Sequence, residues 1–489
     1  MASQHLRQEM RRPSGRLISC AGGTSSSDIV KTMKQRMYRW ALTLVTMNNW
    51  ILYGLLFALF FAKAFFTLDP DFGWHLSSGE YILQHGIPSH DIYSYTASNF
   101  SWIHHEWLAD TIGAMVYHLV GGFTVLAVLY ALLWTVAIWL VARTTKARLL
   151  VLFVGVTMVP FSGVRAITWT IVFSAVMIAI YRAKDTRLRA VLPFLILLWA
   201  NMHGSFVVGL AYIGWQLARD RTTASLGVFV MSVLASCVTP YGPGMYVEIV
   251  RTMFDTTLRS RIQEWRSFGV KVDIGIVVGM WAGLLIIAKG AWWRKFLRFE
   301  SLLAIMMLSS VRHAPVFALF ALATIVEQLQ ALVIPMQTLR DRGAKKMVVA
   351  LVMLSVVACV LFSYFALRYA SIDREQPYPQ TIAGYLRQHP CEGNVFAEYN
   401  YGGYLIWKVP SQKLYIDGRM PSWRLGDKSY MDDYIRVLND TDFQRQEFQR
   451  YDIRCAVVRP SLQIAKQLQE SGWRIVSREE GSSIVLYVR

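Results

Sequence analysis

The chain has 489 residues, of which 54% are hydrophobic, and its mean hydropathy is +0.34. This composition is too apolar for an ordinary soluble protein, so the sequence predicts an integral membrane protein. The net charge of +18 does not indicate a nucleic-acid partner: residues 371–489 contain 16 Lys+Arg against 15 Asp+Glu, so the positive excess lies in the apolar first 370 residues.

The first 47 residues are polar and basic, with a Ser/Gly run at residues 22–27. We expect them to form a disordered cytoplasmic tail or to lie on the inner membrane face. They lack a clean signal-peptide pattern with a cleavage site, so the first apolar segment, residues 50–68, is expected to remain as a membrane anchor.

Apolar stretches recur through residues 48–370, which we expect to form a transmembrane domain. Each stretch is near or somewhat below the roughly 20 residues that a helix needs to cross a bilayer. The pattern predicts about eleven transmembrane helices. They are expected at residues 50–68, 123–142, 149–161, 166–181, 190–200, 206–218, 224–239, 272–288, 300–311, 313–326 and 347–368.

Basic residues indicate the orientation of these helices, because short cytoplasmic loops are enriched in Lys and Arg. The N-terminal tail is basic, as are alternate connections at residues 143–148, 182–189, 219–221, 289–298 and 340–346. This places the N-terminus in the cytoplasm and the remaining connections outside, namely residues 69–122, 162–165, 201–205, 240–271 and the C-terminal segment. We therefore expect a multi-pass protein of the inner or plasma membrane. Loop 240–271 departs from the rule with five basic residues, which a long loop tolerates and which could bind an anionic ligand.

The first external loop, residues 69–122, begins with Asp69-Pro70-Asp71, where the proline ends the apolar helix. Carboxylates two residues apart in an extended chain could point the same way. A divalent-metal site, or a general base with an orienting partner, requires such an arrangement. The alternative is that these acidic residues only mark the membrane boundary.

Six of the ten histidines lie in the same loop. Imidazoles near carboxylates suit metal binding, phosphate recognition or proton transfer. No pair has a firm metal-ligand spacing, so surface or hydrogen-bonding histidines are the alternative. The six are His75, His85, His90, His104, His105 and His118.

Glu106 precedes a segment, residues 107–120, whose apolar face is interrupted by Asp110 and His118. This pattern predicts a helix lying at the membrane interface. A transmembrane helix here would reverse the placement of every basic loop downstream. The interfacial helix would hold Glu106 near the membrane surface, where it could serve as a catalytic carboxylate. The alternative is an ordinary carboxylate at a helix N-terminus.

Other polar residues stand at the external ends of the expected helices. Charged groups at membrane depth are costly and usually functional, and arginine suits bidentate contacts with phosphate. Arg165 and Arg312 could bind the phosphate of a lipid-linked donor, the alternative being side chains that extend to the lipid headgroups. The residues are Arg165, His203, Glu264, Arg312 and His313.

Residues 371–489 change to short β-rich runs that alternate with helical ones, which predicts an extracytoplasmic α/β domain. Strands are expected at residues 394–398, 413–417, 454–458, 474–477 and 483–488, and helices at residues 381–389, 443–451 and 462–471. Cys391 and Cys455 could form a disulfide in an oxidising compartment or be two buried small side chains.

Polar groups follow two of these strands, where α/β sheets commonly bind ligands. Tyr401, Asp417 and Arg419 lie among aromatic residues and could stack on a sugar and hydrogen-bond its hydroxyls. The alternative is a structural Gly-rich turn whose aromatic residues pack the domain onto the membrane part.

Asp69-Pro70-Asp71-Phe72-Gly73-Trp74-His75 resembles the acidic motif in the first external loop of the GT-C superfamily of polyprenol-dependent glycosyltransferases. The oligosaccharyltransferase catalytic subunits are the most similar, and the helical layout of nearly the whole chain is similar too. Tyr399-Asn400-Tyr401-Gly402 loosely resembles the Trp-Trp-Asp-Tyr-Gly motif with which those enzymes recognise their acceptor. Neither tryptophan nor the acidic residue of that motif is present, so the acceptor could be a lipid, a glycan or a protein side chain.

The resemblance implies an inverting transfer of sugar from a polyprenyl-phosphate donor to an extracytoplasmic acceptor in the cell envelope. It implies that Asp71 is a catalytic base or a ligand of a divalent metal such as Mg²⁺ or Mn²⁺. Asp69, Glu106 and Glu264 are the other candidate catalytic carboxylates, and His75 joins the candidate substrate ligands. The alternatives are a transporter or flippase of lipid-linked or anionic glycans and an envelope assembly scaffold. A transporter would place ionisable groups near the membrane midplane rather than at one end.

Overall fold

The computed structural model describes residues 49–145, 148–265, 296–336, 378–479 and 483–489. All of them belong to one compact unit, Met47–Arg489. The expected N-terminal tail, the expected helices at 272–288 and 347–368, and two of the five basic residues of loop 240–271 lie outside the described residues.

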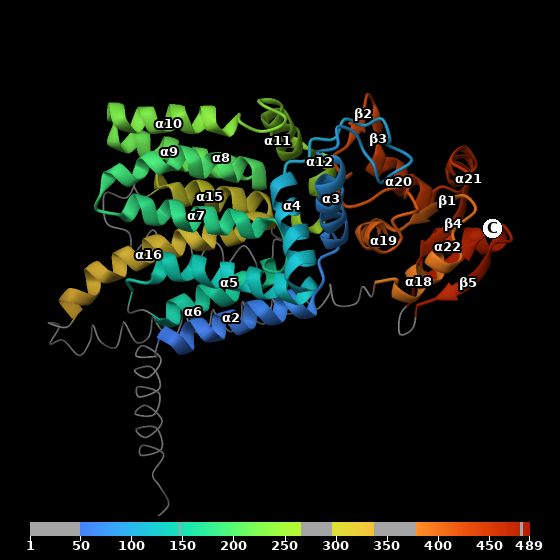
Figure 1. Ribbon diagram of the computed structural model, residues 1–489, viewed down its shortest axis with the longest axis horizontal. Coiled ribbons are helices and arrows are strands. Elements are labelled where there is room, and N and C mark those ends of the chain that lie inside the picture. The colour runs from blue at the N-terminus through green and yellow to red at the C-terminus, as the bar shows by residue number, and fades with distance from the viewer. Residues whose placement is uncertain (1–48, 146–147, 266–295, 337–377, 480–482) are drawn as a thin grey trace, which may run out of the picture. The chain divides into compact units, whose positions relative to one another are not determined.

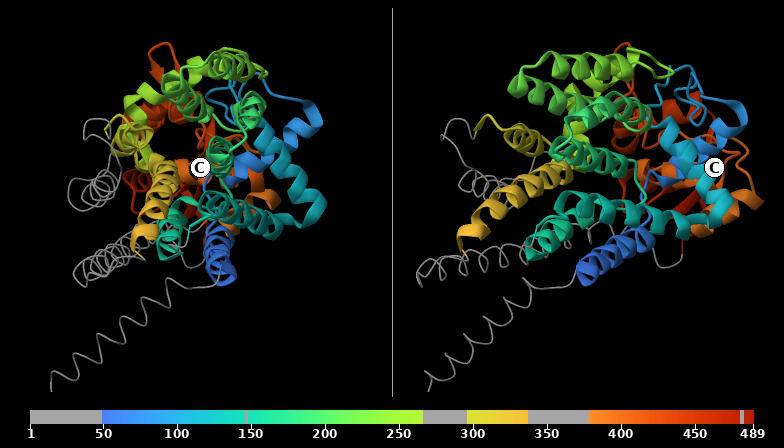
Figure 2. Two further views of the ribbon diagram at one scale, coloured as in Figure 1. Left: turned by 90° about the vertical axis from the view of Figure 1, so that its left-hand side faces the viewer. Right: turned by 60° about the vertical axis from the view of Figure 1, so that its left-hand side comes forward.

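Apolar helices with a common direction make up most of residues 49–336 (Figures 1 and 2). They are α2 (Asn49–Phe66), α5 (Gly122–Ala142), α6 (Arg148–Met158), α7 (Ile167–Arg182), α8 (Leu192–Met202), α9 (Phe206–Asp220), α10 (Thr223–Ser236), α15 (Phe299–Ser309) and α16 (Ala314–Met336). Capping residues and prolines in the sequence determine where some of these helices begin. The Thr222 hydroxyl accepts the backbone N–H of Ser225 and caps α10, and α8 carries proline in its first turn.

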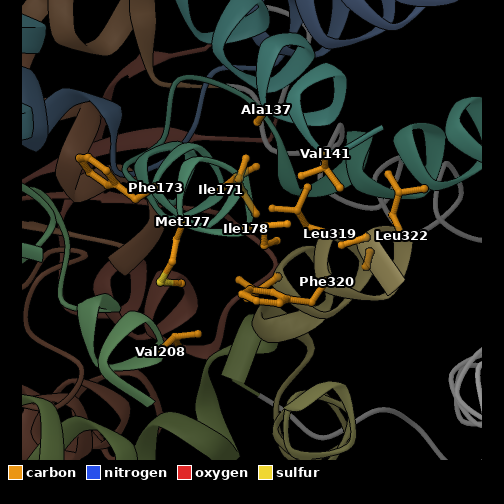
Figure 3. Close-up of a cluster of buried hydrophobic side chains, with 14 of the residues drawn as sticks. Ala137, Val141, Ile171, Phe173, Met177, Ile178, Val208, Leu319, Phe320 and Leu322 are labelled. Carbon is orange, nitrogen blue, oxygen red and sulfur yellow. The ribbon is translucent and has the colours of Figure 1, made fainter. Parts of the chain in front are cut away.

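One continuous hydrophobic core holds these helices together. Helix α5 packs against α2 and α7, and α8 packs against α10. Side chains from α5, α7, α9 and α16 meet in the part of the core that Figure 3 shows. The large rings of Trp134 and Trp199 are fully buried. Burying such side chains is the main favourable term that offsets the entropy lost on ordering the helices.

Two described segments are long and apolar enough to cross a membrane alone, Asn49–Phe66 and Trp107–Ala142. Four shorter apolar helices, Leu150–Phe161, Ile167–Arg182, Thr223–Ser236 and Phe299–Ser309, accompany them. The described residues therefore do not confirm the expected number of about eleven transmembrane helices.

The segment Trp107–Ala142 is not one straight helix. Helix α4 (Trp107–Val116) runs into the π-helical turn η1 (Tyr117–Gly121), and Gly121 and Gly122 follow with φ of +141° and +73°. Only glycine adopts such angles freely, so the chain changes direction before α5 begins. Helices α4 and α3 (Phe72–His85) pack on each other and run across the direction of α2 and α5 (Figure 1). The segment is therefore two helices, and the interfacial position of α4 stays a prediction.

Short helices also connect the apolar ones at both ends. They are η2 (Val159–Phe161), η3 (Thr186–Val191), α11 (Gly244–Phe254), α12 (Thr256–Arg261), η4 (Gln263–Trp265) and η5 (Val311–His313). Three of them, α11, α12 and η4, lie in loop 240–271.

The C-terminal residues form an α/β fold around a four-stranded sheet of order β1-β4-β6-β5. Strand β1 pairs with β4 in parallel, and β6 pairs with β4 and β5 in antiparallel orientation. The strands are β1 (Asn394–Ala397), β4 (Ile453–Val458), β5 (Arg474–Arg478) and β6 (Val485–Val488), with a separate hairpin of β2 (Arg424–Leu425) and β3 (Lys428–Ser429). The helices are α18 (Gln380–Gln388), η7 (Tyr399–Tyr401), α19 (Gly402–Lys408), α20 (Tyr430–Asn439), α21 (Thr441–Arg450) and α22 (Gln463–Glu470).

Most of the expected strands and helices are present, and Cys391 is bonded to Cys455 in a disulfide. The strand expected at residues 413–417 is wrong. Only Leu414 makes sheet contacts there, as isolated bridges to Val395 of β1 and to Ser94 of the first external loop. The core of the C-terminal fold likewise includes Phe100 and Trp102 of that loop.

Candidate functional site

Asp69 and Asp71 lie in the turn between α2 and α3, beyond the apolar end of α2 at Phe66. The backbone N–H of Asp71 donates to Asp69 Oδ1 over 2.9 Å, which fixes the turn that Pro70 introduces. The indole N–H of Trp74 donates to Asp71 Oδ1 over 3.0 Å. Burial and the neighbouring Asp69 carboxylate raise the pKa of Asp71 to about 6, although His75 opposes the shift. Asp71 is therefore ionised at neutral pH but is a stronger base than an exposed aspartate.

Arg165 joins this turn to the external loop 240–271. Its Nε lies 2.7 Å from Asp69 Oδ2, and its Nη2 lies 2.6 Å from Glu264 Oε1. A single guanidinium thus bridges two carboxylates from segments almost 200 residues apart, using the fixed fork of donors that lysine lacks. Three residues predicted from separate loops therefore meet in the structure beside Asp71.

A second polar group surrounds Glu106, which directly precedes α4. Imidazole nitrogens from three segments face its carboxylate: the Nε2 atoms of His75, His105 and His203 lie 3.5, 3.6 and 3.2 Å from its oxygens. His203 ends α8, and its Nδ1 lies 2.7 Å from the Ser205 hydroxyl. Glu106, His75 and His203, which were all candidate site residues, are therefore neighbours.

Asp110 is a site residue that the sequence did not predict. Its carboxylate lies 2.7 Å from His75 Nδ1 and 2.8 Å from His104 Nε2, and it is almost fully buried. Burial alone would lower the pKa of His75, but Asp110 and then Glu106 raise it to about 9, so this imidazole is cationic at neutral pH. The sequence feature that could have identified Asp110 is its position as an acidic residue on the apolar face of residues 107–120.

Arg312 and His313 lie in η5, against the end of loop 240–271. The Arg312 guanidinium lies 4.2 Å from the ring centre of Trp265, next to Glu264, which is a cation–π contact. The Ser310 hydroxyl donates to the backbone oxygen of Glu264 over 3.0 Å, and His313 Nδ1 lies 3.3 Å from the Ser310 oxygen. These contacts place the second predicted cation close to the carboxylate that Arg165 binds.

A pocket opens between α3, α4, α5 and the turn before α7. Its polar residues are His75, Asp110 and Arg165, and the rest of its wall is apolar. The other lining residues are Phe72, Leu76, Ala109, Gly113, Ala114, Leu126, Tyr130, Val164 and Ala166. Its cavity volume is about 30 Å³, so it has room for little more than a water molecule beside His75, Asp110 and Arg165.

The candidate sugar ligands of the C-terminal domain are not at an open surface. Tyr401 is 2% exposed and belongs to the domain core. Asp417 is fully buried and is held by Arg419, whose Nε and Nη2 donate to its two oxygens over 2.8 and 2.6 Å. Arg419 also lies 2.8 Å from Asp91 Oδ1 of the first external loop. The expectation of exposed sugar ligands is corrected, since ion pairing and packing occupy these side chains.

The described residues do not fit a metal centre. Among them, no group of three or more His, Cys, Asp or Glu side chains is arranged to hold a metal ion. Asp71 accepts a hydrogen bond from Trp74, and Asp69 is paired with Arg165. The Asp71 metal site that the resemblance implied therefore has no donor set in the described part of the chain.

No protein-family model matches the sequence, and no curated protein matches it. Solved structures do match. One is the oligosaccharyltransferase of Archaeoglobus fulgidus tethered to an acceptor peptide with the NVT sequon. It is 12% identical with a TM-score of 0.56, over 84% of this chain and 70% of that chain. The chain has the GT-C fold.

A second structure of the archaeal protein, AglB in complex with an inhibitory peptide and a dolichol-phosphate, matches with 11% identity and a TM-score of 0.54. The match covers 83% of this chain and 69% of that chain. ArnT from Cupriavidus metallidurans, bound to undecaprenyl phosphate, matches with 13% identity and a TM-score of 0.49, over 89% of this chain and 97% of that chain. The shared fold with the archaeal oligosaccharyltransferase agrees with the expected architecture of a helical part followed by a C-terminal α/β part, and the expected number of about eleven helices stays a prediction.

Proposed function

We propose that the protein is a membrane glycosyltransferase that transfers a sugar from a polyprenyl-phosphate donor to an extracytoplasmic acceptor. The observation that carries the proposal is the Asp71 carboxylate beside the Asp69–Arg165–Glu264 ion cluster, on a GT-C fold. The position supports it further, since these groups lie beyond the apolar end of α2 and not in the middle of the helices.

In the proposed reaction, Asp71 is the general base. It takes the proton from the acceptor nucleophile as that atom attacks the anomeric carbon of the sugar. The bond between the anomeric carbon and the phosphate oxygen breaks, and the polyprenyl phosphate leaves with the electron pair. Attack from the face opposite the leaving group inverts the configuration. A pKa of about 6 suits this role, because the group is ionised at neutral pH and still basic enough to accept a proton.

Arg165 is the proposed ligand of the leaving phosphate. Its guanidinium is about one quarter exposed and lies beside the Asp69–Asp71 turn, where it could meet a phosphate with its fork of donors. A fixed cation stabilises the charge that develops on the phosphate oxygen as the bond breaks. Arg312, stacked on Trp265 beside Glu264, is the second cation of this group, and His313 lies next to it.

The group around Glu106 has a supporting role in this proposal. The cationic His75 lies between Asp110 and Glu106 and lines the same pocket as Arg165. It adds a second positive charge near the leaving group, and Asp110 holds its ring in one orientation. His203 and His105 keep the Glu106 carboxylate in place on the opposite side.

The proposal specifies neither the class of acceptor nor a metal ion. The archaeal protein was crystallised with an acceptor peptide and, in another crystal, with zinc and sulfate. Because the residues that the structure describes do not offer a donor set for a metal ion, the proposed mechanism has no step through one. A lipid, a glycan and a protein side chain all remain acceptors to test, since the acceptor motif lacks both tryptophans and its acidic residue.

The test is transfer of radiolabelled sugar in membranes that contain the protein, with a panel of polyprenyl-phosphate sugars and with Mg²⁺ and Mn²⁺ supplied. Wild type is compared with Asp71→Asn at matched expression. Glu470→Gln, a change at an exposed carboxylate of the C-terminal domain, is the control. We expect transfer by the wild type and the control, and a fall of about a thousandfold to a small residual rate in Asp71→Asn, as for the loss of a general base. No wild-type transfer across the panel would support a transporter or a scaffold instead.

A further inference from the structure

The first external loop is built into the sheet of the C-terminal domain. The backbone N–H of Leu414 donates to the Tyr93 oxygen over 3.0 Å, and the N–H of Tyr95 donates back to the Leu414 oxygen over 3.2 Å. Leu414 also pairs with Val395 of β1, so residues 93–95 extend the sheet at the β1 edge. Loop side chains enter the domain core as well, including Phe100, which stacks on Trp423 with ring centres 4.3 Å apart. The loop and the domain therefore share one core and one sheet edge.

A buried ion cluster fixes this junction. Arg419 pairs with Asp417 of its own turn and with Asp91 of the loop, and the exposed fraction of all three side chains is 2% or less. The rings of Tyr93 and Trp102 lie 4.8 and 4.6 Å from the guanidinium. A buried charge that loses a partner is strongly destabilising, so the cluster resists any separation of loop and domain.

Gly418, between Asp417 and Arg419 of this cluster, lies in close contact with Asp71. A Cβ atom at position 418 would lie 1.8 Å from Asp71 Oδ1 and 3.1 Å from Trp74 Nε1. These are the two atoms of the hydrogen bond that orients Asp71. The Tyr399 hydroxyl donates to the Gly418 oxygen over 3.2 Å and holds the turn from its other side. Any side chain at 418 would occupy the space of the Asp71 carboxylate.

We propose that the Asp417-Gly418-Arg419 turn of the C-terminal domain positions the Asp71 carboxylate for transfer, and that Gly418 is a positioning residue of the active site. The C-terminal domain then contributes to the chemistry by fixing the orientation of the base, not by touching the sugar through Asp417 or Arg419. The proposal rests on the proposed function, in which Asp71 is the base.

The main experiment compares Gly418→Ala with Gly384→Ala, a matched change in the same domain. A Cβ atom at Gly384, in helix α18, meets nothing within 4 Å. We expect kcat for Gly418→Ala to fall about a hundredfold, as a displacement of about 1 Å at a reacting group can produce. The KM for the donor should stay within about twofold of wild type, because Arg165 is untouched. Gly384→Ala should match wild type in both constants.

A double-mutant cycle separates positioning from general damage to the fold. If Gly418 acts through Asp71, the variant Asp71→Asn, Gly418→Ala retains the same residual transfer as Asp71→Asn alone. Additive losses, or a kcat for Gly418→Ala within threefold of wild type, would overturn the proposal. Asp91→Asn, which loosens the cluster from the loop side, should lower kcat in the same direction.

A cross-linking test does not depend on activity. With Asp71→Cys and Gly418→Cys in one chain, mild oxidation should form a disulfide between the two positions, whereas Asp71→Cys with Gly384→Cys should not cross-link. Failure to cross-link positions 71 and 418 overturns the contact itself. If positions 71 and 418 cross-link in the double-cysteine variant but the wild type transfers no sugar, the contact stands and both the proposed function and the positioning role are removed.

Discussion

At the residue scale, the strongest chemical statement concerns the protonation of Asp71. Burial and the Asp69 carboxylate raise its pKa to about 6, and only the ionised form can accept a proton. We expect kcat/KM to rise with pH through about 6 and then level off. Asp69→Asn removes a negative neighbour, so the midpoint should move to lower pH. A pH–rate profile of both proteins checks this, and a midpoint that moves upward in Asp69→Asn would contradict the assignment.

The two carboxylates held by Arg165 lead to a second prediction. Lysine keeps the charge but cannot bridge Asp69 and Glu264 with a planar fork. We expect Arg165→Lys to lower kcat/KM for the donor roughly tenfold and Arg165→Gln roughly a hundredfold, since only the second change removes the charge. Arg454→Gln, at an exposed ion pair of the C-terminal domain, is the matched control. Equal effects of the Lys and Gln variants would show that charge at 165 is not what matters.

Single residues differ in how far the sequence predicts their position. Asp69, Arg165 and Glu264 were each predicted from their place at a helix end, and ion pairs bring all three together. Asp110 was noted only as an interruption of an apolar face, because its partners His75 and His104 are defined by how α3 packs on α4. Tyr401, Asp417 and Arg419 are buried, which favours the alternative of a structural turn, and polar type in a sequence does not reveal burial.

At the scale of elements, hydropathy and charge together predicted that residues 107–120 and the apolar helix after them are separate, and the structure has a break between α4 and α5. Residues 107–142 are continuously apolar enough to pass as one long membrane helix. The distribution of basic loops argued against that, and the turn at Gly121–Gly122 shows why the segment is two helices. The pairing of residues 93–95 with Leu414 could not be predicted, because the partners lie about 320 residues apart and each run is too short to show a strand pattern.

The Cys391–Cys455 disulfide links the segment before β1 to β4, across 64 residues of chain. In the loop-entropy model, closing a loop of this length stabilises the folded state by about 4 kcal/mol. Because the sheet and the first external loop share a core, we expect the double change Cys391→Ser, Cys455→Ser to lower the Tm of the whole protein in detergent. Cys237→Ser is the control, since Cys237 forms no disulfide. An unchanged Tm, measured by calorimetry, would contradict the prediction.

At the scale of the whole molecule, the site residues gather at one end of the helices. Arg165 from one connection contacts Asp69 and Glu264 from two others, and His203 from a fourth contacts Glu106. The charge pattern of the sequence had assigned these connections to the same side of the membrane, and their contacts agree with that assignment. The number of helices is less predictable, because several described helices are shorter than a bilayer span and two expected ones lie outside the described residues.

The orientation itself is the last prediction, and it decides on which side transfer occurs. Arg187 lies in a basic connection expected in the cytoplasm, and Glu470 lies on an exposed helix end of the C-terminal domain. In a background with Cys20, Cys237 and Cys359 changed to Ser, we expect a membrane-impermeant maleimide to label Glu470→Cys on intact cells. Arg187→Cys should react only after the cells are permeabilised. The reverse pattern would place Asp71, Arg165 and the pocket in the cytoplasm. The acceptor would then have to be cytoplasmic. The reason is that the C-terminal domain contacts Asp71 at Gly418, so the domain and the site lie on the same side of the membrane.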